Sequence, residues 1–313
     1  MNNKMINNCK LCESDNLQIW YTSRQSNLPI MHCAACGLFF VGRVFTSAEQ
    51  KEYYGNFDDY LHFVEAERRI SEVGRRHVAW LEQIQQLIPA DFAKAEQRKL
   101  RLLDIGCGAG DFLAMARKQG FEVYGLELSD PAAKLATEYY NIQVDLQDIA
   151  DDPREGFFDV VTLIGLLEHV IDPRDMLRHA HRLLSSNGIL FIYTPVWGKY
   201  DFLASFLARA SRNRFTRLID RRINQAHLQI FPKTTLINLL EELGLETLSC
   251  EALCEYNLPI TEYFQSIGIT QAGLQSIVAK SVKALIDRQL FFYNNMRVIA
   301  RKPAELPLNT QIL

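Results

Sequence analysis

Hydrophobic and polar positions along this chain predict strands and helices in turn. Short apolar runs indicate strands, and apolar residues recurring every three or four positions indicate amphipathic helices. From residue 100 onward this pattern predicts strands near 100–105, 121–126, 142–145, 158–164, 188–194, 245–252 and 296–301, and helices near 110–119, 131–140, 172–185 and 233–243. Such an alternation is typical of a doubly wound α/β sheet.

The cysteines point to a second kind of unit at the start of the chain. Four of the 7 cysteines form two C-x2-C pairs, namely Cys9 with Cys12 and Cys33 with Cys36. This spacing is typical of a zinc ribbon. Because four thiolates would leave no open coordination position, we expect the zinc to be structural. The alternative is two disulfides or free thiols, and a reducing compartment disfavours the disulfides.

The rest of the pattern before residue 100 sets the domain boundaries. Residues 1–44 are too few to fold on a hydrophobic core alone, so metal should supply the missing stability. Helical spacing continues from Ser47 to about Ile88, and Pro89 then marks a hinge. We therefore divide the chain into a zinc ribbon at 1–44, a helical connector at 45–98, an α/β domain at 99–304 and a polar tail at 305–313.

The first strand of the α/β domain ends in a glycine-rich turn, in the segment LLDIGCGAG. Asp104 ends the strand, and Gly106, Gly108 and Gly110 let the backbone approach a ligand closely. The spacing is G-x-G-x-G, whereas the dinucleotide fingerprint G-x-G-x-x-G would need glycine at Asp111. This difference favours an adenosyl ligand that lacks a pyrophosphate over NAD or FAD.

A second acidic residue supports a nucleoside-containing ligand. The short strand FEVYGLE ends in Glu127, about 20 residues after Gly106. A carboxylate at the end of the second strand can accept hydrogen bonds from both ribose hydroxyls. The alternative is an ordinary acidic side chain on a solvated loop.

At this point the chain resembles class I S-adenosylmethionine-dependent methyltransferases. The matching segments are LLDIGCGAGDFL (102–113), GLELS (125–129), FFDVVTLIGLLEHV (157–170) and NGILFIYTP (187–195). The resemblance implies a seven-stranded Rossmann-like sheet whose last strand is antiparallel. It is specific for the cofactor, S-adenosyl-L-methionine, and says little about the acceptor of the methyl group.

The resemblance also implies roles for the residues around the cofactor. Asp104 would interact with the ammonium end, the turn through Gly106, Gly108 and Gly110 would make room for the ligand, and Glu127 would accept the ribose hydroxyls. Leu128 would pack beside the adenine.

The remaining cofactor contacts come from later segments. We assign the hydrogen bond to the adenine amino group to Asp148, with Ile149 next to it, although Asp145 is only three residues away. Ile164, at the end of the fourth strand, would present its backbone near the methionine part.

Two histidines are candidates for acid–base catalysis. His169 follows the fourth strand and is therefore expected at the edge of the sheet where ligands bind. His227 lies in the segment AHLQIF, which resembles an HL-x-x-F segment that often faces the pocket in related methyltransferases. Either side chain could take a proton from an acceptor hydroxyl. Alternatively, His169 is a loop histidine bonded to the backbone, and an amine or thiolate acceptor needs no protein base.

Two further segments, 197–226 and 255–290, are expected to cover the carboxyl edge of the sheet as lid or substrate insertions. Dimer contacts or plain core packing are the alternatives. The first contains a dense basic stretch interleaved with apolar residues, which could hold a phosphate, a nucleotide-sugar, an acidic lipid surface or RNA, or could simply be solvated. Its arginines are Arg209, Arg212, Arg214, Arg217, Arg221 and Arg222.

Charge and hydropathy limit the choice of function. A net charge of −3 gives no general attraction to nucleic acid, and no apolar run approaches the ~20 residues needed to span a bilayer. Without a signal-peptide pattern the expected compartment is the cytoplasm. We expect a methyltransferase that acts on a small-molecule or saccharide-type acceptor by in-line displacement. The alternatives are a zinc-ribbon rRNA methyltransferase, a non-catalytic cofactor-binding scaffold, and a quinone or lipid methyltransferase that uses 201–222 at a membrane surface.

Overall fold

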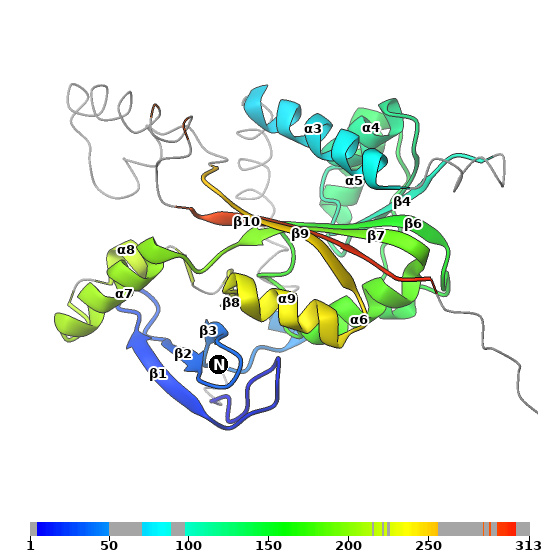
Figure 1. Ribbon diagram of the computed structural model, residues 1–313. Helices are drawn as coiled ribbons and strands as arrows, with labels where there is room; N and C mark the ends of the chain where they lie inside the picture. Colours follow the sequence, from blue (N-terminus) through cyan, green and yellow to red (C-terminus); the bar gives the residue numbers. More distant parts are fainter. Residues whose placement is uncertain are drawn as a thin grey trace, which may run out of the picture.

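The computed structural model consists of a twisted main sheet with helices on both faces and a small cysteine-bearing sheet packed below it (Figure 1). It describes residues 5–49, 71–88, 98–255 except 215, 221, 224 and 225, and 284, 288 and 293–304. Of the two expected insertions, 255–290 lies almost entirely outside the described residues. Residues 50–70 and 89–97 of the expected helical connector lie outside them as well.

The main sheet has the strand order β5-β4-β6-β7-β10-β9. The first four of these strands run parallel, and β10 is antiparallel to both β7 and β9. The doubly wound fold with an antiparallel last strand is therefore confirmed. The strands are β4 (Arg101–Ile105), β5 (Glu122–Leu126), β6 (Phe158–Ile164), β7 (Leu184–Pro195), β9 (Glu246–Leu253) and β10 (Asn295–Arg301).

The expected strand at 142–145 is reduced to a single parallel bridge between Leu126 and Asp145. Two hydrogen bonds hold it, from the Asp145 amide to the Gly125 carbonyl at 2.9 Å and from the Glu127 amide to the Asp145 carbonyl at 3.2 Å. Of the four residues predicted as a strand, only Ile142 is buried. The edge position therefore offers too little apolar contact for a longer strand, and the seventh strand is represented by this bridge.

Helices cover the two faces of the sheet in separate groups (Figure 1). On one face lie α3 (Ser71–Leu87), α4 (Asp111–Lys118) and α5 (Asp130–Tyr140), and on the other α6 (Pro173–Leu183) and α9 (Lys233–Glu242). Trp80 of α3 is fully buried against Phe191 and Tyr193 of β7, so this helix belongs to the packing of the main sheet. A short 3-10 helix, η1, spans Ile149–Asp151.

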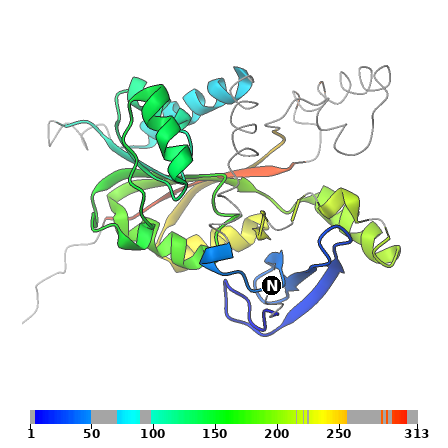
Figure 2. The ribbon, with the colours of Figure 1, turned by 180° about the vertical axis from the view of Figure 1, so that it is seen from behind.

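The N-terminal sheet contains β1 (Leu17–Thr22), β2 (Pro29–Cys33) and β3 (Phe39–Val41). Its fourth strand, β8 (Gln229–Ile230), comes from the second half of the chain and pairs antiparallel with β3. Figure 2 shows this sheet and the helices α7 (Lys199–Ala210) and α8 (Arg217–Asp220) side by side, away from the main sheet. The segment 197–226 thus packs on the cysteine-bearing sheet, where Trp197 stacks on Phe39 with ring centroids 3.6 Å apart.

Candidate active site and cysteine cluster

The glycine turn joins β4 to α4 at the carboxyl edge of the parallel strands. Gly106, Gly108 and Gly110 all have positive φ, at 70°, 54° and 77°. A Cβ at Gly110 would lie 2.9 Å from the Ala136 Cβ, so this glycine lets α5 pack against the turn. A Cβ at Gly106 would lie 2.9 Å from a methyl group of Leu166, so this glycine lets the loop after β6 approach. The turn is therefore shaped by both packing and backbone conformation.

Glu127 is fastened to the backbone by both carboxylate oxygens. Oε2 accepts a hydrogen bond of 3.0 Å from the Gly108 amide, and Oε1 accepts from the amides of Leu128 at 2.8 Å and Ser129 at 2.9 Å. Each carboxylate oxygen has two lone pairs, so hydroxyl donors can still be accepted. The predicted ribose acid and the predicted glycine turn thus form one hydrogen-bonded unit.

Asp104 is buried at the end of β4, with 3% of its surface exposed. Its Oδ1 accepts a hydrogen bond of 2.6 Å from the Thr162 hydroxyl on the neighbouring strand. Burial raises the pKa of Asp104 to about 7, and the nearby Glu127 carboxylate raises it further, against the hydrogen bond from Thr162. A cation brought to this carboxylate would favour its charged form.

The residues expected around the adenine lie on the loops after β5 and the bridge strand. Leu128 is 54% exposed and Ile149 is 4% exposed. Asp148 is exposed and caps η1, its Oδ1 accepting from the Ala150 amide at 3.0 Å. Asp145 accepts from Arg154 Nη2 at 3.0 Å. Both acids therefore contact the protein through one carboxylate oxygen, Asp148 in a helix cap and Asp145 in an ion pair.

The loop after β6 and the segment before β8 bring both candidate bases together. The ring centroids of His169 and His227 lie 4.8 Å apart. His169 Nδ1 lies 2.9 Å from the Ala226 carbonyl oxygen, and His227 Nδ1 lies 3.1 Å from the Arg222 carbonyl oxygen. Burial lowers the pKa of each histidine to about 4, so both rings are neutral near pH 7. Ile164 ends the strand that leads into this loop.

Glu168 lies beside the two histidines, and the sequence analysis did not predict it as a site residue. It is 4% exposed, and its Oε2 accepts a hydrogen bond of 2.9 Å from the Thr194 hydroxyl on β7. Its backbone carbonyl accepts from the Leu228 amide at 2.8 Å, which ties the loop to the segment that carries His227. Burial raises the pKa of the Glu168 carboxyl. In the sequence, the only sign of a functional role for Glu168 is that this acidic residue precedes His169 shortly after a strand.

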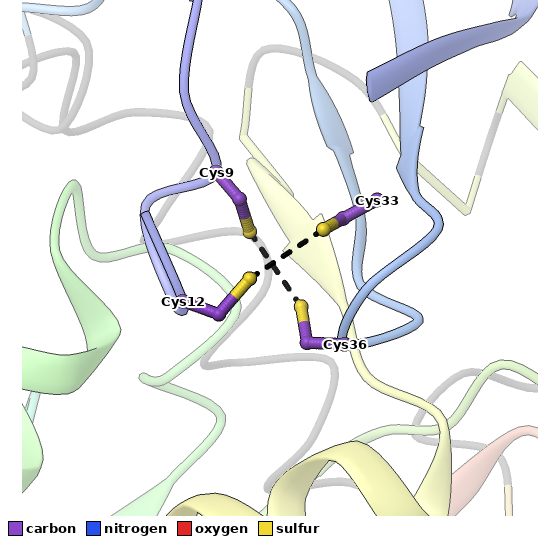
Figure 3. A group of neighbouring side chains, drawn as sticks. All are labelled: Cys9, Cys12, Cys33 and Cys36. Carbon is purple, nitrogen blue, oxygen red and sulfur yellow. Dashed lines mark hydrogen bonds between the residues drawn. The ribbon is translucent and has the colours of Figure 1, made fainter. Parts of the chain in front are cut away.

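The four cysteines of the two C-x2-C pairs converge in the N-terminal sheet (Figure 3). Cys9 Sγ lies 3.6 Å from Cys36 Sγ, and Cys12 Sγ lies 3.5 Å from Cys33 Sγ. Sulfurs bound to one tetrahedral ion at about 2.3 Å stand about 3.8 Å apart. A hydrogen bond with the Cys36 thiol lowers the pKa of Cys9 to about 5. The cluster therefore has the donor set and spacing that suit a zinc ion.

The cysteine cluster and the histidine pair are joined through β8 and the first turn of α9. Gln229 donates from its side-chain amide to the carbonyls of Leu167 at 2.7 Å and Val170 at 2.8 Å, so it brackets the loop that carries His169. The Thr235 hydroxyl donates to the Cys36 carbonyl at 2.6 Å. The N-terminal sheet therefore supports the backbone around the candidate bases.

Part of the basic stretch has a structural role. Arg222 Nε donates to Asp201 Oδ1 at 2.8 Å, and Asp201 is fully buried. The Arg209 guanidinium lies 4.4 Å from the centroid of Trp20. Phe215 and Arg221 lie outside the described residues, as do the side chains of Arg217 and Leu218.

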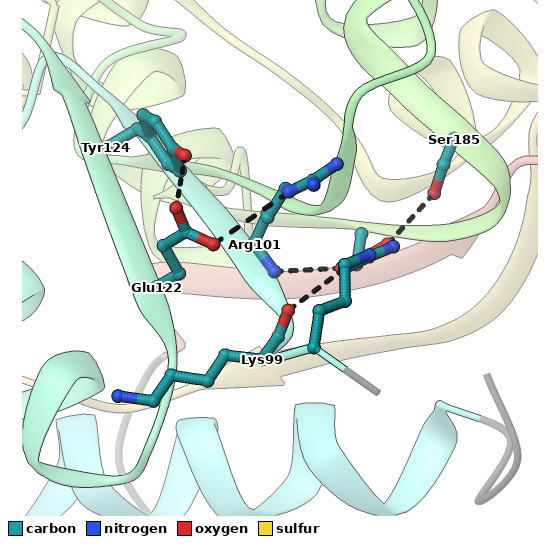
Figure 4. A network of polar contacts seen from close by, with 7 residues as sticks. Lys99, Arg101, Glu122, Tyr124 and Ser185 are labelled. Atoms are coloured by element: carbon teal, nitrogen blue, oxygen red, sulfur yellow. Dashed lines mark hydrogen bonds and ion pairs between the residues drawn. The ribbon is translucent and has the colours of Figure 1, made fainter. Parts of the chain in front are cut away.

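A separate charged network lies at the opposite, amino end of the sheet (Figure 4). The buried Asp159 forms an ion pair with Arg98 and accepts from the Arg101 amide at 2.8 Å. Glu122 accepts from the Tyr124 hydroxyl at 2.6 Å. These groups hold the start of β4 and β5 and lie away from the glycine turn, so their role is structural.

The fold and the family comparison together define the class of protein. Residues 74–250 match the methyltransferase domain family, and this match exceeds half of the 313 residues. The chain therefore belongs to this family and is a class I S-adenosylmethionine-dependent methyltransferase. Within the described residues, no helix is both long and apolar enough to cross a membrane.

The named relatives are ubiquinone biosynthesis O-methyltransferases. That of Nitrosomonas europaea is 35% identical over 100 residues, which cover 30% of this chain and 43% of the relative. That of Bordetella avium is 28% identical over 183 residues, which cover 55% of this chain and 72% of the relative. The first match thus spans less than half of the relative's length.

A solved structure shows the same fold. A geranyl diphosphate methyltransferase in complex with GPP and sinefungin superimposes with a TM-score of 0.50 at 18% identity, over 75% of this chain and 82% of that one.

Proposed function

We propose that this methyltransferase moves the methyl group of S-adenosylmethionine to a hydroxyl group of a small organic acceptor. The observation that carries the proposal is the contact between Leu166 and Gly106, because it sets the loop bearing Glu168 and His169 directly beside the cofactor turn. The relatives' name, O-methyltransferase, agrees with oxygen as the acceptor atom.

The cofactor roles follow the positions of the residues at this edge. Asp104 receives the ammonium group of the cofactor, directly or through water, and Glu127 accepts the ribose hydroxyls. Leu128 and Ile149 contact the adenine, and Asp148 accepts from its amino group.

The chemistry needs an oriented acceptor in a dry site. As the acceptor oxygen bonds to the methyl carbon, the methyl–sulfur bond breaks and S-adenosylhomocysteine leaves. The acceptor's proton must also depart. Neutral His169 and His227 are the groups we propose to accept a hydrogen bond from the acceptor hydroxyl, and Ile164 presents its backbone near the methionine part.

We also propose that Cys9, Cys12, Cys33 and Cys36 bind a structural zinc ion. Their sulfur spacing supports this role, and a closed set of four thiolates leaves no position for substrate. The ion would hold the knuckles from which β3 extends to pair with β8.

One observation favours an acceptor taken from a lipid surface. Helix α7 exposes a group of large apolar side chains followed by Arg209, a composition suited to the interface of an anionic membrane. The exposed fractions are 50% for Phe202, 52% for Leu203, 65% for Phe206 and 44% for Leu207. The two proposals are compatible, because a small hydroxylated acceptor can carry an apolar tail.

The test uses purified full-length protein, methyl-labelled S-adenosylmethionine and host lysate. The product is divided by solvent extraction and by mass, with and without RNase, and Glu127→Ala serves as the cofactor-site control. We expect RNase-resistant label of low mass. Label that enters the organic phase would support a lipid-like acceptor, and water-soluble label would indicate a saccharide or another polar one. RNase-sensitive label of high mass would overturn the proposal in favour of an RNA acceptor.

A further inference from the structure

We propose that Gln229 is a positioning residue for methyl transfer, because its side-chain amide fixes the loop that carries His169. Gln229 is 1% exposed and lies on β8, the strand that joins the second half of the chain to the cysteine-bearing sheet. The inference deepens the proposed function and rests on it for the role of the two histidines. The hydrogen bonds that carry the inference involve neither cofactor nor acceptor.

The amide nitrogen of the Gln229 side chain donates to two carbonyls of the same loop. They are those of Leu167 at 2.7 Å and Val170 at 2.8 Å, which flank Glu168 and His169. A side-chain amide carries two hydrogens, so both bonds can form at once. Among the described residues, no other group donates to either carbonyl. Because Leu167 and Val170 are buried, loss of this amide would leave two buried carbonyls without a donor, which is unfavourable.

The backbone next to this side chain is attached to the same loop. The amides of Leu228 and Gln229 donate to the Glu168 carbonyl at 2.8 and 3.3 Å. His227 directly precedes Leu228, so the contacts that hold the loop also hold the second candidate base. A change at Gln229 should therefore affect both histidines.

The other side of β8 is anchored in the cysteine-bearing sheet. Gln229 pairs with Phe40 of β3, and Phe40 is 1% exposed. Phe40 belongs to the same hydrophobic core as Cys33 and Leu167. Gln229 is thus held by its backbone in one sheet and reaches the loop with its side chain. Through this residue the cysteine-bearing sheet sets the position of the loop.

The chemical consequence is a neutral and aligned pair of histidines. Burial lowers the pKa of both His169 and His227 to about 4, against an ordinary value of 6.5. Of the charged groups around His227, Glu168 raises its pKa and Arg222 lowers it. By holding the loop, Gln229 limits the access of water to the pair and keeps the rings in place to accept a hydrogen bond. A displacement of about 1 Å can slow a reaction by about 100-fold.

The test is an NMR titration of the histidine side chains in the cofactor-free, full-length protein and its variants. The signals are assigned with His169→Gln and His227→Gln. Gln229→Met keeps the length of the side chain but has no hydrogen to donate. We expect the pKa of at least one of the two histidines to rise from about 4 toward 6.5 in this variant, because a loosened loop admits water. Gln229→Asn keeps both hydrogens on a shorter side chain, so the pKa should rise less.

The matched control is Gln85→Met. Gln85 on α3 donates its side-chain amide to the Gln119 carbonyl at 3.0 Å, so this variant loses the same kind of hydrogen bond at another place. It should leave the titration of both histidines unchanged. Transfer of labelled methyl groups to acceptors in host lysate is measured in the same preparations. It should fall about tenfold or more in Gln229→Met, while affinity for S-adenosylmethionine changes much less.

A merely structural role would lower the temperature of unfolding and leave the histidine pKa values of the folded protein unchanged, and that result would overturn the proposal. Equal methyl transfer by Gln229→Met and Gln85→Met would overturn it as well. If Gln229→Met does not fold, Gln229→Asn takes its place in both comparisons. If the unchanged protein transfers no label although the histidine titration responds as expected, the proposed function fails and the hold of Gln229 on the histidine pair stands.

Discussion

The Gly108 amide donates a hydrogen bond of 3.0 Å to Glu127, which joins the turn after β4 to the end of β5. The Gly106 amide donates to the Leu126 carbonyl at 2.8 Å and reinforces the same junction. Two parts of the proposed cofactor site that are 19 residues apart in sequence are therefore joined by hydrogen bonds. Glu127 is both a candidate ligand for the ribose and the group that holds the turn in place.

This arrangement predicts the effect of Glu127→Ala. The variant loses the acceptor for the ribose hydroxyls and leaves the Gly108 amide without its partner, so affinity for S-adenosylmethionine should fall by about 30-fold, which corresponds to ~2 kcal/mol for hydrogen bonds to a charged group. Isothermal titration calorimetry measures this affinity. Glu122→Ala is the matched control, because Glu122 lies at the opposite end of the same strand. Among the described residues, its side chain forms a hydrogen bond with Tyr124 and an ion pair with Arg101 (Figure 4).

The chain should still fold, because Glu127 lies at the surface edge of the sheet and not in its core. If Glu127→Ala and Glu122→Ala both bind the cofactor like the unchanged protein, the ribose assignment is wrong.

Asp104 predicts a pH dependence of stability. Its pKa in the folded protein is about 7, above the ordinary value of 3.8, because burial disfavours the charged form. The folded state therefore gains stability from the protonated carboxyl. This contribution is complete below about pH 4, shrinks as the pH rises, and is lost above about pH 7. Asp104→Asn, which can still accept from Thr162, should make the cofactor-free protein more stable at pH 8 and change it less at pH 5, as measured by urea unfolding.

The same carboxylate predicts that cofactor binding releases a proton. The ammonium group of S-adenosylmethionine favours the charged form of Asp104, so binding near pH 6.5 should release a proton and weaken as the pH falls. Calorimetry in two buffers with different ionisation enthalpies measures the release. Asp104→Asn should remove it. An identical binding enthalpy in both buffers for the unchanged protein would contradict the assignment.

Periodicity and local motifs predicted much of the fold, because parallel strands buried on both faces leave continuous apolar runs. They located the glycine turn, Glu127 and the cysteine pairs, each of which depends on residues close together in sequence. The pairing of β8 with β3 could not be predicted, since two residues carry no periodicity and the partner lies far away in the chain. The meeting of His169 with His227 depends on this pairing, so it escaped prediction for the same reason.

The basic stretch illustrates a second limit. Arginines interleaved with apolar residues predict a charged surface, yet Arg222 turns inward to Asp201. Its Nη2 also donates to the carbonyls of Val196 at 2.7 Å and Asn294 at 2.9 Å. Sequence spacing does not tell which arginine of such a set finds a buried carboxylate, because the partner groups come from two segments that are far apart in the chain.

The ion pair between Arg222 and Asp201 predicts a large loss of stability in the variant Arg222→Met. The change would leave Asp201 buried without its cation, which typically costs ~3–5 kcal/mol. Urea unfolding measures the loss. Arg209→Met is the control, because a guanidinium over an aromatic ring contributes only ~0.5–1 kcal/mol at an exposed site. The double variant Arg222→Met with Asp201→Asn should recover part of the loss, and a double variant no more stable than Arg222→Met would speak against a charge effect.

If the cysteine cluster binds zinc, loss of the ion should also lower methyl transfer at the proposed active site. Cys12→Ser should lower the bound zinc, measured by elemental analysis, and destabilise β3, which pairs with β8 next to His227. Methyl transfer should therefore fall more than S-adenosylmethionine affinity, because the glycine turn lies on the main sheet, whereas β8 directly adjoins the segment that carries His227. Cys250→Ser is the control, since this half-buried cysteine of β9 lies outside the cluster. Equal losses of cofactor affinity and transfer would instead indicate general unfolding, and unchanged zinc content in Cys12→Ser would show that the four cysteines do not hold the ion.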